Sequence, residues 1–182
     1  MLIMIFAKDS TLDKLVILFV LEKMEIPLTE NSITDICCAD NGWVNYMDCK
    51  DALFRLVEAN LIYKTKVSEK EDSFTITYEG RNCLLHFYRK IPLSLREQMQ
   101  DFIADNRMEF KRAQEYVSDF VKNDDGSYTV TLKIRSPLIK ESIFEINIKA
   151  PSHESAMECC NRWQTNAHSV YEHIYESLIE NG

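Results

Sequence analysis

The N-terminal part of the chain repeats its apolar residues every three to four positions, which predicts three short helices. Ser10, with an aspartate three residues later, indicates the start of the first helix, and Pro27 ends it. Thr29 is expected to cap the second helix, and Asn45 the third, over residues 45–58. The apolar positions are Leu12, Leu15, Val16, Phe19 and Val20 in the first helix, Ile33, Ile36 and Cys37 in the second, and Cys49, Leu53, Leu56 and Val57 in the third.

The spacing then changes from helical to alternating. Residues 62–78 alternate on both sides of the polar stretch SEKEDS, which predicts a β-hairpin. One strand face is expected to hold Ile62, Lys64 and Lys66, and one face of the next strand Phe74, Ile76 and Tyr78. Thr77 is expected to cap a fourth helix, with Gly80 in its first turn. A glycine there lacks the side chain that would hold the turn away from a neighbouring backbone.

Pro92 separates this part of the chain from a second part. Ser94, with a glutamate three residues later, indicates the start of a long helix that continues to Phe120 and stops at residues 123–126. Two alternating segments predict a second hairpin, and Ser152 a last helix. The expected apolar positions are Leu95, Met99, Phe102, Ile103, Phe110, Ala113, Val117 and Phe120; then Tyr128, Val130, Leu132, Ile134, Phe144, Ile146 and Ile148; then Ala156, Cys159, Trp163, Ala167, Val170, Ile174 and Leu178.

Three helices, a hairpin and a fourth helix, with a tight Asp40-Asn41-Gly42 turn between the second and third helices, follow the order of a winged helix-turn-helix. The predicted fold class is therefore α+β, with a winged helix-turn-helix domain at residues 1–92 and a helix–β-hairpin–helix unit at residues 93–182. Two strands and two helices bury little surface. We therefore expect the second unit to dimerise or to sense a signal, and the protein to be a homodimer.

Three stretches carry a resemblance to a known family: IPLTENSITDICCADNGWVNYMDCKDALFRLVEANLIY, FTITYEGRNCLLHF and RKIPLSLREQM. They resemble a bacterial family of about this length, known only as a domain of unknown function and similar to PadR-like regulators in its winged helix. The resemblance covers most of the first hundred residues and is more diffuse in the rest of the chain. It implies a transcription regulator.

In a helix-turn-helix the second helix enters the major groove and the wing contacts phosphates. Here those elements are residues 45–58 and 62–78. The candidate DNA contacts are Asn45, Tyr46, Lys50, Arg55, Lys64, Lys66, Lys70 and Arg81. The outward row of the helix also holds Asp48, Asp51 and Glu58, and carboxylates facing phosphates weaken DNA binding. A winged helix that docks a basic protein instead of DNA is therefore the alternative, and each basic residue is equally well explained as solvated surface.

Charge does not favour a basic nucleic-acid module. The chain carries 21 Lys and Arg against 29 Asp and Glu, and both parts, divided at Pro92, are net acidic. An isoelectric point near 5.1 removes long-range attraction to DNA, although clustered basic residues still allow specific binding. Double-stranded DNA remains the expected partner, and no membrane is expected: the apolar run Leu15–Leu21 is too short to span a bilayer. Without a basic n-region or cleavage site, the chain is expected to be cytoplasmic.

Motifs of enzymatic chemistry are not found. The chain has 4 glycines and no phosphate loop, dinucleotide fingerprint, G-x-S-x-G or H-E-x-x-H, so we expect neither an enzyme nor a cofactor. The 6 cysteines include no C-x-x-C, which favours reduced, buried thiols over a redox sensor, and the 4 histidines suggest no metal site. Trp43, Tyr46 and Tyr88 are candidates for a small-molecule effector pocket, with core packing as the alternative.

Overall fold

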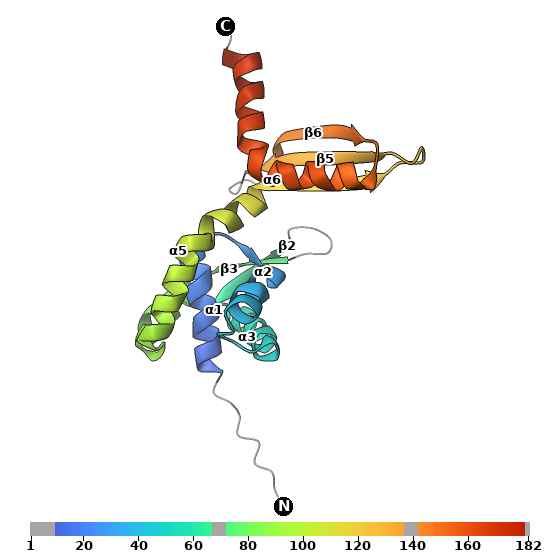
Figure 1. The fold of residues 1–182 in the computed structure, drawn as a ribbon. Coiled ribbons are helices and arrows are strands. Elements are labelled where there is room, and N and C mark those ends of the chain that lie inside the picture. The colour runs from blue at the N-terminus through green and yellow to red at the C-terminus, as the bar shows by residue number, and fades with distance from the viewer. Residues whose placement is uncertain (1–9, 67–71, 137–141, 181–182) are drawn as a thin grey trace, which may run out of the picture. The chain divides into compact units, whose positions relative to one another are not determined.

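The computed structural model describes residues 10–66, 72–136 and 142–180, and it has a mixed α+β fold (Figure 1). Internal contacts divide the chain into two units, Met1–Asn106 and Arg107–Gly182. This boundary lies within helix α5 (Leu93–Glu115), later than the break expected at Pro92. The first half of α5 belongs to the N-terminal unit because Met99 and Ile103 are buried and Phe102 contacts Trp43 edge to face at 5.8 Å.

The N-terminal unit contains the expected helices and hairpin. Its elements are α1 (Thr11–Met24), β1 (Leu28–Thr29), α2 (Glu30–Thr34), the π-helical turn η1 (Asp35–Asp40), α3 (Tyr46–Glu58), β2 (Ile62–Lys66), β3 (Asp72–Ile76), α4 (Tyr78–Phe87) and the 3-10 turn η2 (Tyr88–Lys90). The sheet is antiparallel in the order β1-β3-β2. The sequence pattern did not predict β1, which extends the hairpin to a third strand by pairing Leu28 with Phe74.

Helix α1 forms the centre of this unit and packs against α3 and α4. Every residue of the run Leu15–Leu21 is buried, as expected for a core helix. The helix ends at Glu25, which adopts a left-handed conformation with φ 55° two residues before Pro27. The helix begins directly after Ser10, as predicted, but the Ser10 side chain makes no capping hydrogen bond.

Two other predicted caps of this unit are confirmed. Thr29 Oγ1 accepts a hydrogen bond from the Ser32 amide at 3.2 Å, and Asn45 Oδ1 accepts one from the Met47 amide at 3.0 Å. Each bond satisfies an amide that has no partner within its helix. The short polar side chains therefore determine where α2 and α3 begin.

The passage from β3 into α4 depends on Thr77 and Gly80. Thr77 Oγ1 accepts from the Gly80 amide at 3.0 Å and donates to the Leu61 carbonyl at 3.0 Å. A Cβ on Gly80 would lie 2.0 Å from the Leu61 carbonyl oxygen, so the predicted close approach of backbones is confirmed. The prediction that Tyr78 lies in the strand is wrong. Tyr78 is the first residue of α4, because the cap at Thr77 ends β3 at Ile76.

The C-terminal unit has three strands instead of the predicted two. Its elements are the end of α5, β4 (Tyr116–Lys122), β5 (Tyr128–Arg135), β6 (Ser142–Ala150), α6 (His153–Tyr175) and the π-helical turn η3 (Glu176–Glu180). The sheet is antiparallel in the order β4-β5-β6, and α6 covers one face (Figure 1). The predicted extension of the long helix to Phe120 is therefore wrong beyond Glu115. Residues 116–122 pair with β5 along their whole length.

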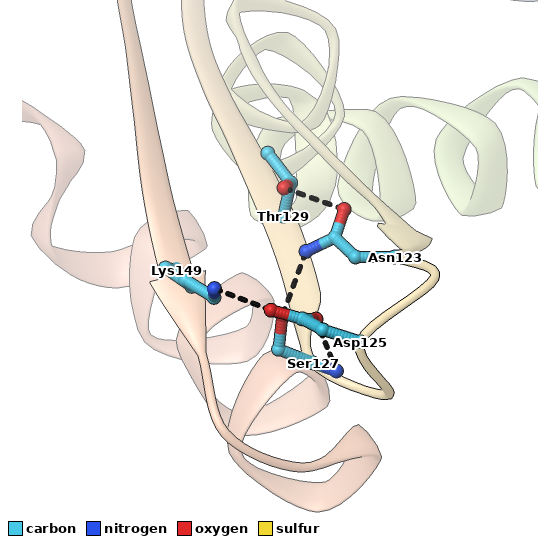
Figure 2. A network of polar contacts seen from close by, with 5 residues as sticks. All are labelled: Asn123, Asp125, Ser127, Thr129 and Lys149. Carbon is cyan, nitrogen blue, oxygen red and sulfur yellow. Dashed lines mark hydrogen bonds and ion pairs between the residues drawn. The ribbon is translucent and has the colours of Figure 1, made fainter.

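Residues 123–126 form the turn that joins β4 to β5. The Asn123 amide donates to the Ser127 carbonyl at 2.8 Å, and Gly126, at φ 83°, closes the turn. Figure 2 shows the Asn123 carboxamide between Ser127 and Thr129, and the Lys149 side chain of β6 beside Asp125. Lys149 Nζ lies 2.6 Å from Asp125 Oδ2. The Lys149 ammonium holds the pKa of the Asp125 carboxyl well below its usual range. Residues expected to stop a helix thus form a hairpin turn.

Helix α5 also begins differently from the prediction. The amides of Leu95 and Arg96 donate to the Pro92 carbonyl at 3.1 and 3.0 Å, so the helix starts at Leu93. Ser94 then lies inside the first turn and is not the N-cap. The predicted capping box is therefore wrong, because Pro92 has the fixed φ suited to a helix start.

The second core lies between the sheet and the first half of α6. Val130, Leu132 and Ile134 pack with Ala156, Trp163 and Ala167. The Trp163 indole donates to the Lys133 carbonyl at 3.2 Å. Ser152 caps α6 as predicted, accepting from the Ser155 amide at 3.2 Å. Beyond Ala167 the predicted apolar stripe is largely exposed, and this part of α6 projects past the sheet (Figure 1).

Candidate nucleic-acid interface

Helix α3 buries one side and leaves the other exposed. Cys49, Leu53 and Leu56 are buried as predicted, together with Ala52, and Val57 is half-buried. Asp51, Arg55 and Glu58 of the predicted outward row are exposed, and Asp48 is half-buried. The buried side of α3 therefore packs against the core, as the helical periodicity predicted.

Two apolar residues on this outward side were missed by the sequence reasoning. Met47 is 71% exposed and Phe54 is 62% exposed. Their spacing to Asp51 and Glu58, by three and four residues, places all of them on one helix face. The helical spacing of Met47 and Phe54 relative to these carboxylates is the sequence signal that could have predicted their exposure.

The first turn of α3 carries three of the candidate contacts. The Asn45 carboxamide is used as the helix cap, and Tyr46 is exposed. Lys50 forms an ion pair with Glu30 of α2, and its ammonium lies 5.4 Å from the centre of the Tyr46 ring. The hydrogen bond that the Lys50 ammonium donates to the Glu30 carboxylate raises the pKa of Lys50. This lysine is thus anchored between two elements.

Strand β2 supplies the next candidates. Lys64 Nζ lies 2.7 Å from Asp72 Oδ2 on β3, and this contact raises the pKa of Lys64. The negative charge of the Glu30 carboxylate makes a smaller contribution to the raised pKa of Lys64. Lys66 is exposed at the end of β2, and Lys70 lies outside the described residues. Lys64 is therefore paired with the neighbouring strand, whereas Lys50 is paired with α2.

Arg55 and Arg81 also form ion pairs, each with its own carboxylate. Arg55 Nε lies 2.9 Å from Asp51 one turn earlier on α3, and the hydrogen bond raises the arginine pKa. Arg81 Nε lies 2.7 Å from Glu22, which links the start of α4 to α1. The counter-ions come mostly from other elements, so their identity was not available from sequence spacing.

Four predicted cations, Lys50, Arg55, Lys64 and Arg81, thus already contact carboxylates. All four are at least one-third exposed, and solvent screening makes the contribution of such ion pairs to stability small. A phosphate can therefore replace such a carboxylate at modest cost. The surface is suited to salt-sensitive contacts, with less excess positive charge than a basic groove.

Two of the six cysteines, Cys37 and Cys49, are buried in the core, whereas the other four are half-buried. Burial raises the pKa of Cys37 and raises that of Cys49 to about 12, so both remain protonated thiols near neutral pH. Trp43 contacts Phe102, and Tyr88 stacks on Phe19 at 6.1 Å. These contacts agree with the core-packing interpretation of the two rings.

Two further properties were searched within the described parts of the chain. No set of three or more His, Cys, Asp or Glu side chains is grouped so as to hold a metal ion in residues 10–66, 72–136 and 142–180. In the same ranges, no helix combines the length and the apolar character needed to cross a bilayer.

Comparison with known proteins identifies the family. Neither the curated proteins nor the solved structures include a significant match to the chain. A family model does match, and it covers residues 13–178, which include both units. The chain therefore belongs to the family described as a domain of unknown function, DUF4364.

Proposed function

We propose that this protein is a DNA-binding transcriptional regulator whose N-terminal unit is a winged helix-turn-helix. The observation that carries the proposal is the arrangement of that unit. Helix α2 continues into η1, residues 41–45 join η1 to α3, α3 exposes one face, and the β2–β3 hairpin completes a sheet in the order β1-β3-β2. This is the element order in which a recognition helix precedes a wing.

In this proposal α3 enters the major groove with its N-terminal turn leading. Tyr46 and Lys50 are near the bases or phosphates, and Lys64 and Lys66 of β2 contact the backbone. Phosphate oxygens replace Glu30 on Lys50 and Asp72 on Lys64. The regulator acts in the cytoplasm as a homodimer, so that two copies of α3 read two half-sites.

The test is binding to random-sequence duplex DNA, measured by fluorescence anisotropy at several salt concentrations. Each phosphate contact adds about 0.9 to the slope of log affinity against log salt. Replacing Lys64 and Lys66 together with Glu is expected to weaken binding by at least about tenfold and to lower the slope by about 2. The Gln versions keep the hairpin free of added negative charge and are expected to lower the slope equally.

A matched control changes the same net charge in the other unit. Lys111→Glu with Lys122→Glu alters two lysines of the C-terminal unit, one of which forms an exposed pair with Glu115. This variant is expected to keep the wild-type slope. An equal loss of DNA affinity in the Lys64/Lys66 and Lys111/Lys122 double variants would mean that only overall charge matters. Salt-independent or undetectable DNA binding by the wild type would refute the DNA proposal.

One observation favours a second function, docking of a protein on α3. Met47 and Phe54 are large apolar side chains that lie exposed beside Asp51 and Glu58. Such a mixed surface suits a partner that offers apolar and basic side chains. Phe54→Ser would then abolish capture of that partner, whereas Lys64 and Lys66 would be dispensable. The reverse pattern supports DNA binding.

A further inference from the structure

Strand β6 forms one edge of the C-terminal sheet and pairs only with β5 among the described strands (Figure 1). Its pairing is regular from Phe144 to Ala150. At one end, a register shift leaves Ile143 without a partner on β5, and at the other Pro151 follows the strand. An open edge has unpaired backbone donors and acceptors that can hydrogen-bond to another strand. The regular stretch thus offers seven residues for pairing.

This stretch is complementary to itself when a second copy runs antiparallel and Asn147 lies opposite Asn147. Residues directly opposite then have numbers that sum to the same value and point to the same face. Glu145 lies opposite Lys149, and Ile146 lies opposite Ile148. At the ends the large Phe144 meets the small Ala150. Opposite charges and β-branched pairs are the combinations that stabilise neighbouring strands.

The charges on the face away from α6 extend this match. Lys133 lies 3.0 Å from Glu145, and Lys149 lies 2.6 Å from Asp125. In the paired arrangement one row of charged side chains crosses the interface between the copies. It runs from Lys133 to Glu145 of one copy and then to Lys149 and Asp125 of the second copy. The signs alternate along this row, and the two-fold axis repeats the row once more. No like charges are brought opposite each other.

We propose that two copies of this chain associate through their β6 edges, antiparallel and centred on Asn147, to form one continuous six-stranded sheet. Each copy contributes its three strands, and the two-fold axis places both α6 helices on the same face. Ile148, which is 40% exposed in the single chain, is covered by Ile146 of the second copy. This surface lies in the C-terminal unit and does not depend on DNA binding.

Charge reversal tests the register directly. Glu145→Lys places Lys opposite Lys149, and Lys149→Glu places Glu opposite Glu145, twice per dimer in each case. Each variant alone is expected to weaken dimerisation by about tenfold or more at low salt, measured by sedimentation equilibrium without DNA. An equimolar mixture is expected to form heterodimers with wild-type affinity, because every opposed pair then has opposite signs.

The mixture also separates this proposal from a loss of internal ion pairs. Both variants disturb the contacts to Lys133 or Asp125 within one chain, and mixing cannot repair those. Circular dichroism is the check that each variant is folded. As a second measurement, Asn147→Cys is expected to form a disulfide-linked dimer on mild oxidation, above the background from the native cysteines. A monomeric wild type, unweakened single variants, a mixture that fails to associate, or no added cross-linking would each overturn the proposal.

Discussion

Replacing Gly80 with Ala tests the contact that joins the hairpin to α4. The added Cβ would lie 2.0 Å from the Leu61 carbonyl oxygen, whereas ordinary contact begins at 3.4 Å. The Leu61 carbonyl must therefore retreat, and it accepts hydrogen bonds from the Thr77 amide and hydroxyl, both at 3.0 Å. Losing both hydrogen bonds lowers the free energy of unfolding by roughly 1–3 kcal/mol, and the overpacking itself lowers it by a similar amount.

Intrinsic helix preference acts in the opposite direction. Alanine in a helix is favoured over glycine by about 1 kcal/mol. The net expectation is that Gly80→Ala lowers the free energy of unfolding of the N-terminal unit by about 3 kcal/mol. The sign of the change is therefore informative, because helix preference alone predicts a more stable protein.

The measurement is urea unfolding followed by the fluorescence of Trp43 in a Trp163→Phe background. Trp43 belongs to the N-terminal unit and packs on Phe102, so its emission reports that unit. Asn82→Ala, an exposed substitution on α4, is the control and is expected to change stability by no more than about 0.5 kcal/mol. If Gly80→Ala were as stable as the wild type or more so, the close approach of Leu61 would be refuted.

Three other predictions follow from burial and charge. Because burial raises the pKa of Cys49 to about 12, its thiol is expected to resist maleimide at pH 8 in the native protein and to react in urea; rapid native labelling of this residue would contradict its burial. The Asp125 pKa is lowered in the folded state, so its contribution to stability is present above about pH 4 and lost as pH falls through the folded value. Asp125→Asn is therefore expected to be less stable than the wild type in urea at pH 7, and the difference should shrink on acidification; a constant difference would count against the ion pair with Lys149. Phe54→Ser is expected to change the unfolding free energy by no more than about 0.5 kcal/mol, and a larger loss in urea titration would show that this side chain is covered.

Local chemistry made much of the fold predictable. Thr29, Asn45, Thr77 and Ser152 begin helices where expected, because each side chain bonds to an amide two or three residues away. Gly80 was also predictable, since a glycine in the first turn of a helix suggests a close neighbour. Such contacts join residues that are close along the chain, so they can be predicted from the sequence.

The structure of residues 116–122 could not be predicted from local sequence patterns. Val117 and Phe120 fit a helical stripe, yet the segment is a strand because β5 offers a partner along its whole length. The same holds for β1, whose two residues become a strand only by pairing with β3. A segment that fits both spacings takes the structure that its distant neighbours stabilise.

The candidate interface divides in the same way. The sequence by itself determined that α3 has an outward row, where that helix begins, and which cations lie on it and on β2. Only the tertiary structure decided that Lys50 pairs with Glu30 of α2, and that Arg81 pairs with Glu22 of α1. Ion pairs between elements depend on packing that brings distant residues together, whereas helix starts and faces depend on neighbours along the chain.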